Sequence, residues 1–128
     1  MREKHHRATF SACHLPPSTI LVTVEGDIDA TNGRSLAVYI ERHVVDSTRL
    51  VLDLKPVDFF GTAGFAALLN VNVVCSRYGV DWAILVGPQV HRLLRICDPE
   101  FTLPLADPQS GVEDLYASPG DRKLLVGR

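Results

Sequence analysis

The chain has 128 residues, with 13 Lys and Arg against 15 Asp and Glu and a formal net charge of −2. This length predicts one domain, and the absence of a basic stripe argues against nucleic acid as the main partner. The apolar runs are far shorter than the ~20 residues of a membrane helix. The basic start has no apolar stretch behind it and predicts no signal peptide. Three widely spaced cysteines indicate no disulfide framework and favour a reducing cytoplasm.

The first half of the chain predicts two strands, a helix and a third strand. Residues 8–14 and 19–25 are the strands, and the Pro- and Ser-containing turn between them predicts a hairpin. Apolar residues at every fourth position predict a helix over about 31–46, and residues before it offer helix caps. The mostly apolar run at 49–54 is typical of a strand buried on both faces.

The second half continues the alternation. The patterns predict a helix over about 63–78, a buried strand at 82–86 and a helix over 89–97. Leu103-Pro104-Leu105 is a candidate edge strand, because its proline cannot donate to a ladder. Residues 110–117 suggest a last short helix.

The order ββαβαβα(β)α predicts an α/β fold: a mixed sheet that begins with a hairpin, continues as β-α alternation and has helices packed on it. We expect a flexible N-terminus over 1–7, a domain over 8–118 and a loose tail over 119–128.

A glycine-rich loop precedes the second helix, with the sequence Phe59-Phe60-Gly61-Thr62-Ala63-Gly64-Phe65. Thr62 is expected at or beside the helix N-cap, where a hydroxyl can cap the helix. The same position suits a phosphate, because a helix start offers free N–H groups and partial positive charge. The two glycines either allow internal packing or let a partner approach the backbone. A cap and a phosphorylation switch are therefore both open.

The second helix presents two apolar arcs when its residues are placed about 100° apart. One arc holds Leu68, Val71, Val74 and Cys75, and the other holds Leu69 and Val73. A sheet can cover only one of them. The other is covered by a neighbouring helix or forms an apolar patch open to a partner.

Three stretches resemble those of STAS domains, specifically the bacterial anti-sigma factor antagonists. Gly26-Asp27-Ile28-Asp29 resembles the element after the family's second strand, Leu50-Val51-Leu52-Asp53-Leu54 its third strand, and Phe60–Phe65 its switch loop. The resemblance covers about residues 8–117 and includes Val90–Leu94 and Leu103–Leu105.

The resemblance implies a partner-switching protein that is not an enzyme and needs no cofactor. Such an antagonist binds an anti-sigma factor of the histidine-kinase-like ATPase fold and releases a sigma factor. The kinase phosphorylates the switch loop, and a phosphatase reverses this. On this basis the partner-binding residues are expected to be Asp27, Asp29, Gly61, Thr62, Ala63, Gly64, Phe65, Leu69 and Val73.

The switch loop departs from the family pattern at its usual acceptor. That position is Ala63, which has no oxygen to modify, and the preceding acidic position is Gly61. Thr62 matches the first hydroxyl of the family's pair. Either Thr62 is the acceptor, or the antagonist is always competent. Asp29 and Asp53 match family acidic positions and are alternatively a helix cap and a strand-end hydrogen-bonding group.

Other classes of function find less support. A metal site or small enzyme would use His5, His6, Cys13 and His14, but the spacing is not that of a zinc site, and neighbours in a strand point to opposite faces. A soluble STAS accessory subunit of a transporter or a stress-signalling scaffold would share the fold. Cys13, Cys75 and Cys97 form a redox switch or are buried and inert.

Overall fold

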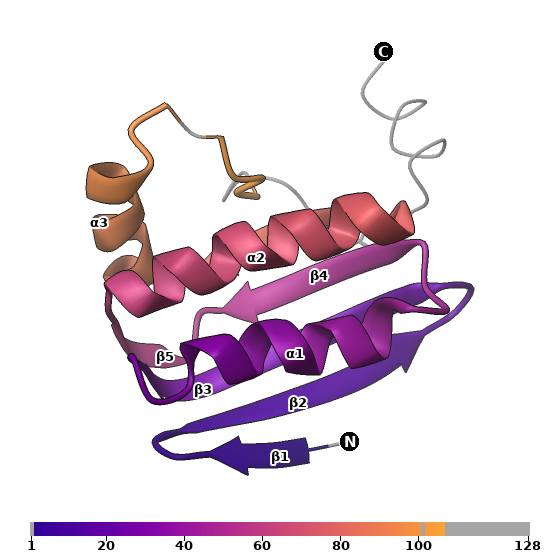
Figure 1. Cartoon of the computed structure of the whole chain (residues 1–128), viewed down its shortest axis with the longest axis horizontal. Coiled ribbons are helices and arrows are strands. Elements are labelled where there is room, and N and C mark those ends of the chain that lie inside the picture. Colours follow the sequence, from indigo (N-terminus) through magenta and orange to yellow (C-terminus); the bar gives the residue numbers. More distant parts are fainter. Residues whose placement is uncertain (1, 101, 107–128) are drawn as a thin grey trace.

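The computed structural model describes residues 2–100 and 102–106 and forms a six-stranded mixed sheet with three helices, an α/β fold as predicted (Figure 1). Its elements are β1 (Arg2–His5), β2 (Ala8–Leu15), β3 (Thr19–Ile28), α1 (Gly33–Val44), β4 (Arg49–Leu54), β5 (Val57–Phe60), α2 (Thr62–Tyr78), β6 (Asp81–Val86) and α3 (Pro88–Cys97).

The sheet has the strand order β1-β2-β3-β4-β6, with β5 attached to β3 off this path. The hairpin strands β2 and β3 are antiparallel, whereas β4 and β6 continue the sheet in parallel. β3 therefore has a divided role: residues 19–23 pair with β4, and residues 26–28 pair with β5. Within the pairing of β3 with β5, the register shifts between Gly26 and Asp27.

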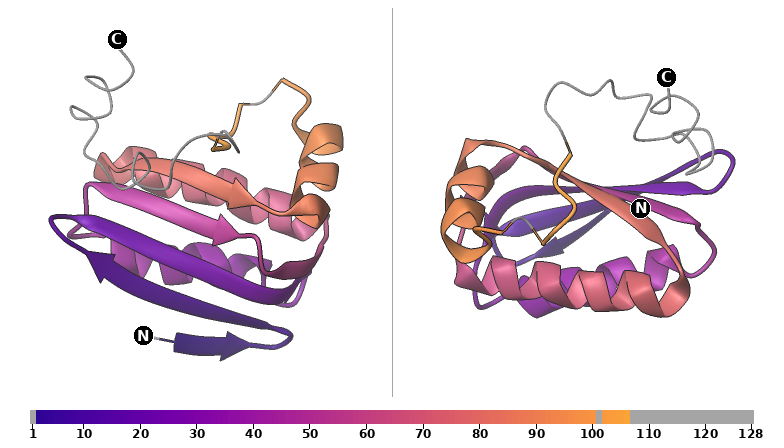
Figure 2. Two further views of the ribbon diagram at one scale, coloured as in Figure 1. Left: turned by 180° about the vertical axis from the view of Figure 1, so that it is seen from behind. Right: turned by 90° about the horizontal axis from the view of Figure 1, so that it is seen from above.

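Helices α1 and α2 lie side by side on one face of the sheet, and α3 lies at one end, beside β5 (Figures 1 and 2). The fourfold repeat of α1 turns Leu36, Ile40 and Val44 into the core, as expected for an amphipathic helix. The first predicted arc of α2 is buried as well. None of the described helices combines the length and apolar character needed to cross a membrane.

The strand β4 is buried on both faces, as its apolar run predicts. Leu50, Leu52 and Leu54 pack in the main core, and Val51 joins Ala83 in a second cluster. Fully burying one such side chain stabilises the fold by about 1.5–3 kcal/mol. The strand begins at the buried Arg49, whose Nη1 lies 2.6 Å from Oδ2 of Asp81 in β6.

The N-terminal segment differs from the flexible end that we expected over 1–7. Arg2–His5 form β1, which pairs antiparallel with β2. Glu3 accepts a hydrogen bond of 2.8 Å from Arg42 of α1, and the His5 ring stacks on Phe10 at 4.7 Å. These contacts hold a strand whose side chains carry no apolar pattern.

At the other end, the candidate edge strand is reduced to a single parallel bridge between Ile84 and Leu105. The amide of Ala106 donates to the Ile84 carbonyl at 2.8 Å. The helix expected at 110–117, the domain boundary at 118 and the tail at 119–128 lie outside the described residues. The strand β5 was not predicted.

Candidate partner-binding site

Two loops expected in the site lie against each other at one end of the sheet (Figure 1). β5 runs along the end of β3, so that Asp27 pairs with Phe59, and the amide of Gly61 donates to the Ile28 carbonyl at 3.0 Å. The starts of α1 and α2 also touch: a Cβ on Gly33 would lie 2.9 Å from the Ala63 carbonyl oxygen. The loops after β3 and before α2 therefore form one surface.

Thr62 is the first residue of α2, and its side chain is exposed. The N-cap residue is Gly61, in extended conformation, so no side chain caps this helix. The capping role considered for Thr62 is therefore wrong, although its position beside the cap is as predicted. An exposed hydroxyl in the first turn lies near the helix amides, where a phosphate would gain hydrogen bonds and favourable helix-dipole interaction.

The two glycines of the loop have different surroundings. Gly64 is buried, and a Cβ there would lie 2.6 Å from Cε1 and Cζ of Phe60. Gly61 is half-buried, and a Cβ there would lie 3.3 Å from the ring of Phe59. Gly64 thus makes room for a ring of the protein itself, whereas Gly61 lies at the surface.

Phe59 belongs to this surface although the sequence reasoning did not assign it there. Its side chain is 54% exposed, whereas that of Phe60 is 5% exposed. Strand residues alternate between faces, so one of two consecutive aromatics in a strand must point away from the core. This alternation could have predicted the exposure of Phe59, but only if residues 57–60 had been recognised as a strand.

Asp29 and Asn32 shape the loop after β3. A carboxylate oxygen of Asp29 accepts from the hydroxyl and, at 2.9 Å, from the amide of Thr31, and these hydrogen bonds lower the pKa of Asp29 below its usual value. Asn32 is fully buried; its Nδ2 donates to the carbonyls of His5 and Asp27, and its Oδ1 accepts from the amide of Asp29. Asn32 thereby fixes the loop. It is one of the residues before the helix that offered a cap, and it is the N-cap residue of α1, but its side chain makes no capping hydrogen bond.

The remaining expected site residues divide into exposed and packed ones. On α2, Leu69 is 44% exposed and Val73 is 55% exposed, so the second apolar arc of the helix stays at the surface. Ala63 is half-buried, and the half-buried Phe65 packs against the core. Asp53, at the end of β4, accepts from the Lys55 amide at 3.0 Å, which is the strand-end role considered for it.

The three cysteines lie on three different elements and are free thiols. Cys75 is buried, and this burial, with the nearby Asp81 carboxylate, raises the pKa of its thiol to about 12. Cys13 is exposed on β2, and Cys97 is half-buried at the end of α3.

Two histidines of the N-terminal region, His5 and His14, make side-chain contacts. His5 lies 3.0 Å from Glu3, and the ring of His14 faces that of His43, with centroids 6.5 Å apart. In the part of the chain that the structure describes, no three His, Cys, Asp or Glu side chains gather as a metal site would require.

Comparisons with known proteins agree on the family. The model of the STAS domain matches residues 13–108. Osmosensory protein A of Mycobacterium tuberculosis is 31% identical over 127 residues, which cover 95% of this chain and 73% of that protein.

Two solved structures share the fold. The first, an anti-sigma factor antagonist from Mycobacterium paratuberculosis, aligns with a TM-score of 0.69 and 25% identity, over 85% of this chain and 91% of the other. The anti-sigma factor antagonist SpoIIAA, in its unphosphorylated form, aligns with a TM-score of 0.62 over 93% of this chain and 97% of its own, at 11% identity. The chain therefore belongs to the STAS domain family and has the fold of the anti-sigma factor antagonists.

Proposed function

We propose that this protein is an anti-sigma factor antagonist. It binds an anti-sigma factor of the histidine-kinase-like ATPase fold in the cytoplasm and thereby releases a sigma factor. Its role is regulatory binding and not catalysis. The observation that carries the proposal is the joint surface of the Asp29 and Thr62 loops, in a chain that shares its fold with solved antagonists.

The proposed contact surface extends from these loops onto α2. Thr62, Leu69 and Val73 are exposed along the helix, and Phe59 stands beside Gly61. An apolar strip next to a polar loop is the composition expected for a site that binds another protein. Gly64 and Phe65 support this surface from within.

Phosphorylation of Thr62 is the proposed control, reversed by a phosphatase. Thr62 carries an exposed hydroxyl at the start of α2, whereas the side chain of Ala63 has no hydroxyl. A phosphate adds nearly two negative charges, which the helix start tolerates. The fold would therefore persist while the partner meets a charged, enlarged side chain.

Titration calorimetry against each anti-sigma kinase of the host tests the binding. Thr62→Glu should weaken the complex, and Thr62→Ser and Thr62→Ala should retain it. Ser76→Glu places the same charge on an exposed position near the other end of α2 and serves as the control. If no host kinase binds the unmodified protein, the proposal fails.

Incubation with the kinase and ATP, followed by mass spectrometry, tests the proposed phosphorylation of Thr62. Phosphate should appear on Thr62. Phosphate on another residue, or none from a kinase shown to be active, would remove the switch and leave a constitutive antagonist.

The name of the relative Osmosensory protein A favours a second candidate, a STAS subunit of an osmotic-stress signalling scaffold or transporter. Pull-downs from the native host, before and after osmotic shock, distinguish the two. Recovery of a permease or scaffold protein in place of an anti-sigma factor would favour the second candidate.

A further inference from the structure

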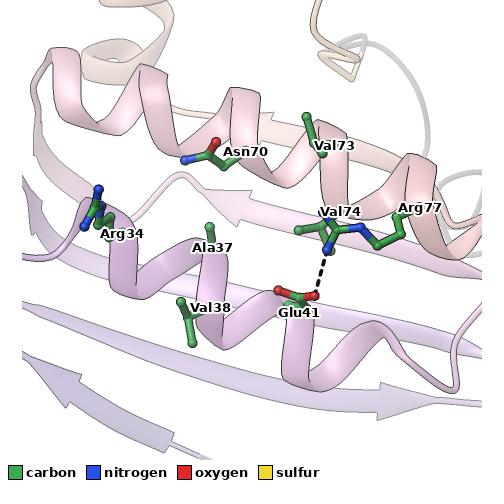
Figure 3. A pocket seen from close by; sticks show the side chains of 8 residues that line it. All are labelled: Arg34, Ala37, Val38, Glu41, Asn70, Val73, Val74 and Arg77. Atoms are coloured by element: carbon green, nitrogen blue, oxygen red, sulfur yellow. Dashed lines mark hydrogen bonds and ion pairs between the residues drawn. The ribbon is translucent and has the colours of Figure 1, made fainter.

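A groove runs between α1 and α2 on the outer side of the helical layer (Figure 3). It consists of two adjoining hollows of about 250 and 310 Å³, which share Arg34 and Asn70. The smaller one begins at Gly33 and Ala63, next to the Thr62 loop. The groove therefore starts at the proposed partner surface and continues along both helices.

The groove has a narrow, apolar floor. Near the Thr62 loop it is lined by small residues of both helices, and further along by Ala37 and Val74. Val38 and Val73 stand on either side, 57% and 55% exposed (Figure 3). α1 has 12 residues and is about 18 Å long, which matches a partner helix of about three turns. An amphipathic helix can use such a groove through apolar residues three and four positions apart.

The groove has a net positive charge, opposite in sign to that of the whole chain. Its charged lining residues are Arg34, Glu41 and Arg77, a net charge of +1, and Arg34 forms no ion pair in the part of the chain that the structure describes. The whole chain has a net charge of −2. Glu41 is itself engaged, because it accepts hydrogen bonds of 3.1 Å from Arg77 and from the Tyr78 hydroxyl.

We propose that the groove binds an acidic, amphipathic helix of the partner, a contact additional to that at Thr62. The apolar side of that helix covers the floor between Val38 and Val73, and its carboxylates meet Arg34 at the mouth. That the helix belongs to the anti-sigma factor rests on the proposed function. The charge complementarity rests on this chain alone.

A displayed library of helical peptides of about three turns, selected against the whole protein, tests the groove without the partner. The enriched peptides should carry Asp and Glu beside apolar residues three and four positions apart. Val73→Glu and Arg34→Glu should weaken their binding about tenfold or more. Val45→Glu, at a residue 54% exposed but outside the groove, and Arg92→Glu on α3 are the matched controls and should bind as the original protein does.

Glu41→Gln provides a test of opposite sign. It removes the one carboxylate among the residues that line the groove and leaves an oxygen that can accept from Arg77, so acidic peptides should bind severalfold more tightly. Enrichment of basic or neutral peptides, no enrichment, or equal effects of Val73→Glu and Val45→Glu would overturn the proposal. So would a dimer in sedimentation that Val73→Glu dissociates, because a second copy would then cover the groove.

Variants of the groove, titrated with an anti-sigma kinase that binds the original protein, test whether the helix belongs to that kinase. Val38→Glu, on the α1 side of the groove and outside the proposed Thr62 surface, should weaken that complex, and Val45→Glu should not. Equal affinities would remove the anti-sigma factor as the occupant, although its binding at Thr62 would stand. Failure of every kinase to bind the original protein would instead reject the proposed function and, with it, this assignment of the helix.

Discussion

Replacement of Gly64 by alanine tests whether the glycine serves internal packing. A Cβ at this position would lie 2.6 Å from two ring atoms of Phe60. Ordinary carbon contacts are about 3.5–4.0 Å, so the ring or the helix must move by roughly 1 Å. The Phe60 side chain is only 5% exposed and belongs to the main core, which leaves it little room to move.

The expected change in stability combines two opposed effects. Overpacking a core costs about 1–3 kcal/mol, whereas replacing a helical glycine by alanine otherwise gains about 1 kcal/mol. We therefore expect Gly64→Ala to lower the free energy of unfolding by about 1 kcal/mol. For a chain of this length the melting temperature should fall by roughly 3–5 °C.

Urea unfolding, followed by the fluorescence of the buried Trp82, measures the effect. Phe60→Leu, which shortens the obstructing side chain, is the partner variant for a double-mutant cycle. In that background Gly64→Ala should cost less or become stabilising. If Gly64→Ala stabilises the original protein by about 1 kcal/mol, as in an open helix, the packing argument is refuted.

Three further predictions concern other parts of the structure. Asn32→Ala should lower the free energy of unfolding by about 3 kcal/mol, because buried backbone groups lose their partners, and urea unfolding would show it; a loss under 1 kcal/mol would contradict the role of this side chain. Glu3 has a pKa of about 2 against its usual 4.5, chiefly because Arg42 donates a hydrogen bond to it. Between about pH 5 and 2 the unfolded chain therefore binds more protons than the folded one, so the free energy of unfolding decreases as the pH is lowered. Glu3→Gln should make this decrease smaller in acid unfolding curves. Iodoacetamide at pH 8 should alkylate the exposed Cys13 in the folded protein but not Cys75, whose thiol is buried and protonated. Mass spectrometry of peptides measures this, and alkylation of Cys75 in the folded protein would contradict it.

Much of the fold was predictable because long elements carry a period. The repeat of α1 and the apolar run of β4 are strong signals, and both elements form where expected. The short strands β1 and β5 carry no such signal. The charged β1 is held by backbone pairing and the contact between Glu3 and Arg42, neither of which is visible in the sequence. β5 has only four residues, too few to show alternation.

The candidate site was predictable in outline but not in detail. The position of Thr62 at the start of α2 follows from the helix pattern, and the resemblance brought in the loop after β3. The sequence left internal packing and partner approach both open for Gly64, because the choice depends on where the Phe60 ring lies in space. The groove was hidden for a similar reason. The pattern of each helix reveals its own buried side but not the space left between two helices.

The divided pairing of β3 links the two loops of the site mechanically. β5 pairs with residues 26–28 of β3, and the register of this pairing shifts just after Gly26, whose φ of 95° suits glycine and where a Cβ would overlap the Arg7 carbonyl oxygen. Beyond this joint, Asp27 and Ile28 are tied to Phe59 and Phe60 and not to β4. We therefore expect a displacement at Thr62 to reach the Asp29 loop through β5 without a change in the pairing of the central strands. If a partner binds at either loop, as proposed, it would then respond to a chemical change made on the other.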